Sequence, residues 1–203
     1  MPPVKIAIAG DFQDGKSTLI NALCGETVAK TGWGIATTSE LTEYRIPHTD
    51  VYLLDTPGFN ATREGDSDMA RRGIVQADAC IYMLSNCAFT PRMFKDIKDA
   101  LMLPGGHQKP LIPIINDRDR NNDLISRESI ANMKMFGINP LLAGDKMPII
   151  HARKWSKGKH VEEYEQGVAF IKHLLGIEPY RAVSPLERIC VFQCEFYQVI
   201  DSV

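Results

Sequence analysis

Short apolar runs alternate along the chain with segments whose apolar residues recur every three or four positions. The short runs predict strands over residues 5–9, 41–46, 51–55, 79–84, 111–115 and 149–150. The periodic segments predict helices over residues 16–24, 91–103, 126–136 and 162–175, and a further helix that follows residue 68 and ends near residue 76. This alternation indicates an α/β fold with a mostly parallel six-stranded sheet and helices on both faces. The turn residues 47–50 predict a hairpin, which adds one antiparallel strand.

The length of 203 residues suits one such domain, which we expect over residues 1–178, followed by a C-terminal helical extension over residues 179–203. Within the extension, residues 186–203 place apolar side chains at near-helical spacing. We expect this helix to pack on the domain. The alternative is that it forms the first helix of an effector or assembly surface.

Charge and cysteine content narrow the class of partner and the compartment. A formal net charge of -2 gives no electrostatic reason to expect a nucleic-acid partner. The apolar run over residues 4–9 is too short for an export signal or a membrane span, so we expect no membrane insertion. The five cysteines are odd in number and lack C-x-x-C spacing, which favours reduced thiols in a cytoplasmic protein.

The first predicted strand and the first predicted helix enclose a motif of the form G-x-x-x-x-G-K-S. We expect its residues and the one that follows to bind phosphates: Gly10, Asp11, Phe12, Gln13, Asp14, Gly15, Lys16, Ser17 and Thr18. Glycines let successive backbone N–H groups point at phosphate oxygens, and the start of the helix adds its positive end. Lys16 would reach the β- and γ-phosphates and Ser17 would bind Mg²⁺. Asp11 and Asp14 are unusual in such a loop; contact with a partner, with a cation or with solvent are all open.

Two further segments supply candidates for the metal and the γ-phosphate. Asp55 ends a predicted strand, where a carboxylate can hold Mg²⁺ through its water shell, and Gly58 offers a backbone N–H to the γ-phosphate. The loop over residues 25–38 contains Thr37 and Thr38, and a hydroxyl there could complete the Mg²⁺ coordination when a γ-phosphate is present. We favour Thr38, with Thr37 as the competitor.

Together these motifs resemble the P-loop GTPases of the translation-factor-related class, especially the Era-like and bacterial dynamin-like G domains. The resemblance is carried by the segments 10–23 (GDFQDGKSTLINAL), 37–38 (TT) and 53–59 (LLDTPGF), and by 77–79 (ADA) before a hydrophobic strand. It implies a three-layer P-loop NTPase G domain that binds GTP or GDP with Mg²⁺.

The same resemblance implies that guanine is read by a motif N-K-x-D after a strand. Asn116 and Asp119 match this motif, but Asp117 replaces the lysine that would lie over the base. That replacement removes a stacking contact and adds a negative charge, although Arg118 or Arg120 could cover the ring instead. A carboxylate at position 119 favours guanine over adenine, because it would repel an acceptor nitrogen of adenine.

A second base-recognition segment is expected after the last strand. The family pattern there is S/T-A-K, and this chain offers His151, Ala152 and Arg153. The backbone N–H of Ala152 could be presented to the guanine oxygen.

The resemblance covers the catalytic residues only in part. Ras-like enzymes orient the attacking water with a glutamine at the position of Phe59, which cannot hydrogen-bond a water. We therefore assign catalysis to Lys16, Thr38, Gly58 and Gln13, the last as a partial match to the residue that holds K⁺ in related GTPases. Slow turnover is expected, about 10⁻⁴ to 10⁻² s⁻¹ by analogy with unassisted switches. A dimer formed through the nucleotide face, or an effector protein, could raise it.

Three alternatives remain open from the sequence. An arginine among Arg63, Arg71 and Arg72 could act as an arginine finger in trans, although surface arginines are usually only solvated. The chain could be a nucleotide-binding interaction module with negligible hydrolysis, as Phe59 and Asp117 suggest. It could also be an ATPase of the same superfamily, which Asp119 argues against.

Overall fold

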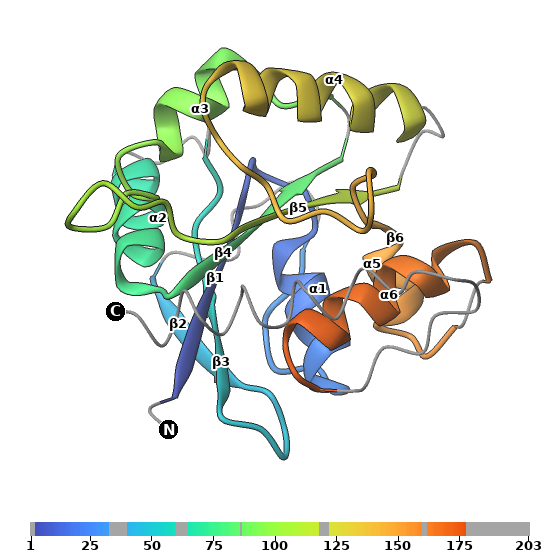
Figure 1. Cartoon of the computed structure of the whole chain (residues 1–203). Helices are drawn as coiled ribbons and strands as arrows, with labels where there is room; N and C mark the ends of the chain where they lie inside the picture. Colours follow the sequence, from blue (N-terminus) through green and yellow to red (C-terminus); the bar gives the residue numbers. More distant parts are fainter. Residues whose placement is uncertain are drawn as a thin grey trace.

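The computed structural model describes residues 3–32, 40–59, 65–85, 87–117, 122–159 and 162–177 (Figure 1). Its strands in these residues are β1 (Val4–Gly10), β2 (Thr42–Arg45), β3 (Val51–Asp55), β4 (Ala79–Leu84), β5 (Leu111–Asn116) and β6 (Ile149–Ile150). Its helices in the same residues are α1 (Lys16–Cys24), α2 (Asp66–Gln76), α3 (Pro91–Ile97), α4 (Asn122–Met135), α5 (Ala152–Trp155) and α6 (Glu162–Leu174). The predicted extension over residues 179–203 lies outside this description.

The strands form one six-stranded sheet in the order β2-β3-β1-β4-β5-β6. β2 runs antiparallel to β3, and every other neighbouring pair is parallel. At the centre, Ile6 of β1 pairs with Leu53 of β3 on one side and with Ala79 of β4 on the other. The predicted mixed sheet with a single antiparallel strand is therefore confirmed.

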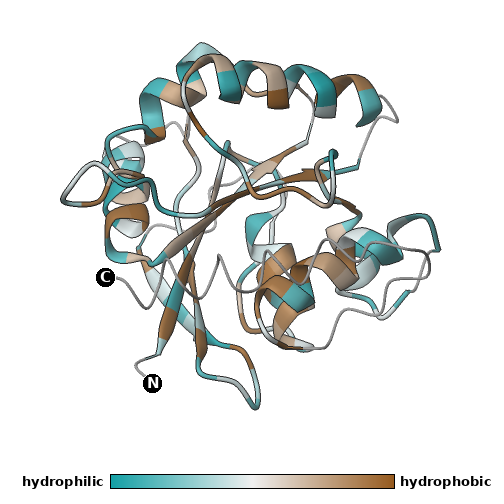
Figure 2. Cartoon of the chain, viewed as in Figure 1, coloured by the Kyte–Doolittle hydropathy of each residue, from teal (hydrophilic) through white to brown (hydrophobic). Residues whose placement is uncertain are grey.

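Two apolar cores cover the two faces of this sheet. Ile6 and Ile8 of β1 pack toward α1, α5 and α6, whereas Ala7 and Ala9 pack toward α2, α3 and α4 (Figure 1). Successive residues of a strand point to opposite faces, so a continuous apolar run serves both cores. Figure 2 shows the corresponding pattern: the central strands are mainly apolar and the edge strand β2 is polar, while α2 and α4 mix polar and apolar residues. The arrangement is the predicted three-layer α/β fold.

The largest departure from the predicted elements concerns the helix expected over residues 91–103. α3 ends at Ile97, because the chain beyond it turns back on itself and uses its backbone groups differently. Leu101 accepts a hydrogen bond from Lys109 N at 2.8 Å, and Leu103 N donates to His107 O at 2.8 Å. These bonds replace the helical ones. Conversely, α2 and α4 each begin a few residues earlier than predicted, and the four-residue α5 was not predicted.

The topology brings the carboxyl ends of β1, β3, β4, β5 and β6 to one edge of the sheet. Ligands of open parallel sheets bind at this edge, and the sequence motifs lie there. No helix among the described residues is long and apolar enough to cross a membrane.

Candidate nucleotide-binding site

The phosphate-binding motif connects β1 to α1, as its mechanism requires. Gly15 is the N-cap residue of α1 and Lys16 is its first residue. The ammonium of Lys16 is buried and donates to Gly10 O at 3.3 Å and to Asp11 O at 2.8 Å. Burial lowers the pKa of Lys16, and the carboxylates of Asp14, Asp55 and Asp11 oppose this shift. The lysine therefore lies folded over the loop, where phosphate oxygens can compete for its donors.

Gln13 stands at the bend of the same loop in a left-handed backbone conformation, with φ of 68°. For a residue other than glycine this conformation costs about 1–2 kcal/mol. Strain of this kind persists where the surrounding structure fixes it, and it is common at functional sites. The bend turns the loop back toward α1.

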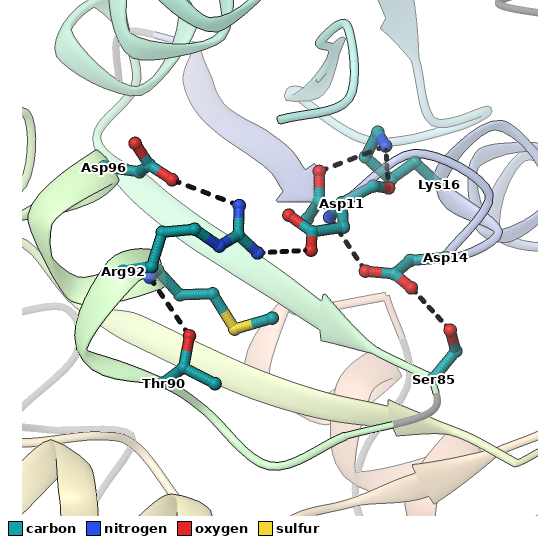
Figure 3. Close-up of polar contacts among 9 residues, drawn as sticks. Asp11, Asp14, Lys16, Ser85, Thr90, Arg92 and Asp96 are labelled. Carbon is teal, nitrogen blue, oxygen red and sulfur yellow. Dashed lines mark hydrogen bonds and ion pairs between the residues drawn. The ribbon is translucent and has the colours of Figure 1, made fainter. Parts of the chain in front are cut away.

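Asp14 braces the loop from inside. Its carboxylate accepts a hydrogen bond from Asp11 N at 2.8 Å and another from the Ser85 hydroxyl, which follows β4 (Figure 3). Burial raises the pKa of Asp14 to about 6, while the Ser85 hydrogen bond and the charge of Lys16 lower it. Of the contacts left open for this residue by the sequence, exposure to solvent is excluded, because only 6% of its surface is accessible.

Asp11 begins a chain of ion pairs that runs from the phosphate loop to α3, as Figure 3 shows, and from there to α2. Its carboxylate lies 2.7 Å from the guanidinium of Arg92 in α3, and Arg92 lies 3.6 Å from Asp96. Asp96 in turn pairs at 3.0 Å with Arg71 of α2, which also pairs with Asp68 at 2.7 Å. Arg71, one of the arginine-finger candidates, is thus engaged within its own chain.

The residues expected to hold Mg²⁺ meet at the start of α1. The Ser17 hydroxyl donates to Asp55 Oδ2 at 3.1 Å, and Asp55 is buried at the end of β3. A hydroxyl beside a carboxylate is an oxygen donor set of the kind that Mg²⁺ prefers. These two residues fit the ion. Thr37 and Thr38 lie outside the described residues.

The segment around Gly58 lies directly against the phosphate loop. Phe59 N donates to Gly10 O at 3.1 Å, and Phe12 N donates to Phe59 O at 3.0 Å. A Cβ atom on Gly58 would lie 2.7 Å from Phe12 Cα, so the close approach requires glycine. The Phe59 side chain is fully buried in the core, on the side of α2 and α3. It is therefore withdrawn from any position beside a phosphate.

Asn116 joins the phosphate loop to the base-recognition segments. Its Nδ2 donates to Asp14 O at 2.8 Å, and its Oδ1 accepts from Ala152 N at 3.0 Å. The N–H of Ala152, which the sequence assigned to the guanine oxygen, therefore has an acceptor within the chain, and its role toward guanine stays a prediction. Because the first N–H groups of a helix lack helical acceptors, the next available backbone donor is that of Arg153 in α5.

Asp117 stands where the family motif has a lysine over the base, but its side chain points into the protein. It is only 6% exposed, and its carboxylate accepts a hydrogen bond from the Tyr164 hydroxyl of α6. Its charge is therefore directed into the protein, toward α6. His151 is the N-cap residue of α5. Asp119, Arg118 and Arg120 lie outside the described residues, as does Arg63.

The sequence did not single out three residues that the structure brings to the site: Ser85, Arg92 and Tyr164. Ser85 had a usable signal, because it follows a predicted strand whose carboxyl end lies at the ligand edge. Arg92 and Tyr164 belong to no motif, and only tertiary packing reveals them.

Known proteins resemble this chain in sequence and in fold. Residues 5–117 match the family model described as 50S ribosome-binding GTPase. A relative from Desulfovibrio desulfuricans, "Probable GTP-binding protein EngB", is 27% identical over 169 residues, which cover 77% of this chain and 82% of the relative.

Solved structures of Era share the fold. Aquifex aeolicus Era bound to GDP and aluminium fluoride is 20% identical with a TM-score of 0.61. Era in complex with MgGDPNP and a segment of 16S ribosomal RNA is 21% identical with a TM-score of 0.60. Each match covers 92% of this chain and 61% of the Era chain, so the protein spans about three fifths of Era. By its motifs, its fold and its match to the family model, the chain belongs to the 50S ribosome-binding GTPase family and is a GTP-binding P-loop GTPase of the translation-factor-related class.

Proposed function

We propose that this protein is a slow, Mg²⁺-dependent GTP hydrolase whose bound nucleotide switches the segments 25–38 and 57–68. The observation that carries the proposal is the contact between Ser17 and Asp55 beside the buried ammonium of Lys16. When bound, Mg²⁺ would neutralise charge on the β- and γ-phosphates. Ser17 would bind the ion directly, and Asp55 would hold it through its water shell.

We assign each remaining role to a residue of the sequence motifs. Lys16 would exchange its contacts with the loop carbonyls for the β- and γ-phosphates, and Gly58 would donate its N–H to the γ-phosphate. Thr38 would complete the Mg²⁺ coordination. For the base, we propose Asp119 together with the backbone N–H of Arg153, since Ala152 N is bonded to Asn116.

Slow turnover follows from the position of Phe59. Its ring is buried, and it carries no hydrogen-bonding group that could orient a water at the position directly after Gly58. Gln13 could hold K⁺ beside the phosphates, which would make hydrolysis faster in potassium than in sodium. The alternative function is a nucleotide-binding interaction module with negligible hydrolysis.

The proposed partners are GTP and GDP, and either an effector protein or a second copy of the chain at the nucleotide face. We propose a cytoplasmic location. The net charge of -2 gave no reason to expect nucleic acid. The family description and the RNA segment bound to Era in one structure weigh against that expectation, so a ribosomal partner is the second candidate.

Phosphate release at saturating GTP tests the proposal. We expect about 10⁻⁴ to 10⁻² s⁻¹ with Mg²⁺ and none with a chelator, measured in sodium and in potassium over a range of protein concentrations. Lys16→Ala sets the background, and Lys134→Ala, on the exposed side of α4, is the matched control that keeps full activity. If wild-type release never exceeds that of Lys16→Ala, the interaction module is the correct description. Tighter binding of ADP than of GDP would overturn the choice of guanine.

A further inference from the structure

The chain turns immediately after β5 at a buried carboxylate. Asp117 N donates to Ile150 O at 2.7 Å, which ties this turn to the end of β6. On its other side, the carboxylate of Asp117 accepts the hydroxyl of Tyr164. Both side chains are buried, with 6% of each residue exposed. A hydrogen bond between two buried side chains holds both in one geometry, because neither group can turn to water instead, so this contact fixes the turn.

The ring of Tyr164 also contacts the second base-recognition segment. It packs edge-on against His151, with ring centroids 5.9 Å apart, and the ammonium of Lys154 lies 5.4 Å from its centroid. These two residues flank Ala152 and Arg153. One tyrosine of α6 thus touches both segments that the sequence assigns to the base.

α6 packs closely against β6, and this packing fixes the position of Tyr164. A Cβ atom on Gly167 would lie 2.2 Å from Ile149 O, so only glycine allows the helix backbone to approach β6. Gly167 and Tyr164 are three residues apart and lie on the same side of α6. Phe170 and Ile171, one turn further, are buried in the core shared with β6. Tyr164 is therefore a fixed point relative to the end of β6.

We propose that Tyr164 is a positioning residue for guanine recognition, which acts by holding Asp117 and the segment 151–154 in one fixed arrangement. The proposal rests on guanine-nucleotide binding as the function of the site. Guanine carries a 2-amino group that hypoxanthine lacks. A site that reads this group must place the protein's hydrogen-bond acceptor for it accurately. Loosening the turn at Asp117 should therefore weaken GDP more than IDP, while the phosphate contacts are unaffected.

The test measures the affinities of nucleotide-free Tyr164→Phe for GDP, IDP and tripolyphosphate by titration calorimetry. Phenylalanine keeps the ring and removes the hydroxyl. We expect GDP affinity to fall about tenfold, IDP affinity about two- to threefold, and tripolyphosphate affinity to stay unchanged. The ratio of GDP to IDP affinity should therefore fall about fourfold. Equal weakening of GDP and IDP, or no change in either, would overturn the proposal.

Two further variants separate positioning from general destabilisation. Asp117→Asn keeps an oxygen that can accept the Tyr164 hydroxyl and should retain the wild-type ratio within about twofold, whereas Asp117→Leu should reproduce Tyr164→Phe. An unchanged ratio in Asp117→Leu would contradict the inference. The matched control is Tyr82→Phe, because the Tyr82 hydroxyl is buried without a hydrogen-bond partner among the described residues. It should alter neither affinity.

Wild-type GDP binding tests the proposed function separately from these ratios. Failure of the wild type to bind GDP would overturn both the function and the inference. Normal GDP binding with an unchanged ratio in Tyr164→Phe would overturn only the inference.

Discussion

The phosphate half of the site comes mainly from one continuous segment, residues 10–17, with Asp55 and Gly58 beside it. The base half combines Asn116 and Asp117 with residues 151–153, which are distant in sequence, and it depends on α6 behind them. The acidic side chains in each half are held by a residue from a neighbouring element. In the phosphate half, Arg92 holds Asp11 through a partly exposed ion pair, and Ser85 holds Asp14 through a hydrogen bond. In the base half, the buried Tyr164 holds Asp117. A contiguous motif thus positions the candidate phosphate-binding residues, whereas packing between distant segments positions the candidate base-recognition residues.

Asn116 is where the two halves meet, so its removal should have the largest effect. Asn116→Ala leaves Asp14 O and Ala152 N buried without their partners, at a cost of about 1–3 kcal/mol each. We expect GDP affinity to fall by at least about 100-fold, and tripolyphosphate affinity to fall as well, because Asp14 belongs to the phosphate loop. Titration calorimetry measures both.

The matched control for Asn116 is Asn132→Ala. Asn132 also donates through its amide to a backbone oxygen, Phe89 O at 2.7 Å, but lies in α4 away from the loop. It should change GDP affinity by less than about twofold. Normal tripolyphosphate binding by Asn116→Ala would show that the two halves are energetically separate, contrary to the structure.

The next effect concerns Asp14, whose pKa burial raises from 3.8 to about 6. Between about pH 4 and pH 6 the folded protein therefore keeps a proton on Asp14 that the unfolded chain has already released. Over this window the free energy of unfolding falls as pH rises, and above about pH 6 the loss is complete. Asp14→Asn removes this titration. In the nucleotide-free protein, its free energy of unfolding minus that of the wild type should therefore be larger at pH 7.5 than at pH 4, by on the order of 2–3 kcal/mol.

Urea unfolding of nucleotide-free protein at several pH values measures this difference between wild type and Asp14→Asn. Asp123→Asn is the control, since Asp123 is exposed on α4 and its side chain pairs only loosely with Lys146, at 3.7 Å. Its curve should run parallel to that of the wild type. Parallel curves for Asp14→Asn would mean that the buried carboxylate does not strain the phosphate half.

The local structure of the phosphate half, a loop between a strand and a helix, was predictable from the sequence for a physical reason. Residues 10–17 act through backbone N–H groups and one helix N-terminus, both of which follow from local spacing. The base half was only partly predictable, because the roles of Ala152 and Asp117 depend on which side chains pack against them. Asn116 takes the N–H of Ala152, and Tyr164 takes the carboxylate of Asp117. No local pattern encodes either contact.

For the fold too, features set by local sequence were predictable and features set by tertiary contacts were not. The succession of strands and helices along the chain and the antiparallel hairpin were predictable from apolar runs and turn residues, whereas the order of the strands in the sheet comes from the structure. The end of α3 was not, because it is set by hydrogen bonds that Leu101 and Leu103 make with residues 107–109. The short α5 also escaped prediction, since four residues are too few for a periodic pattern.

The smallest expected effect concerns the ion pair between Arg92 and Asp11, and it sharpens the contrast between the halves. The side chain of Arg92 is 44% exposed and that of Asp11 is 22% exposed, so solvent screens the pair. Arg92→Met keeps the aliphatic stem and should lower GDP affinity by no more than about fivefold at low ionic strength, with the difference disappearing in about 0.5 M salt. The ratio of GDP to IDP affinity should stay at the wild-type value, in contrast to Tyr164→Phe.

Arg45→Met is the control, because Arg45 forms a similar exposed pair with Asp50 at the far hairpin and should have no effect. A loss that persists in high salt would mean that the chain of ion pairs from Asp11 to Arg71 stabilises the phosphate half as strongly as the buried tyrosine stabilises the base half.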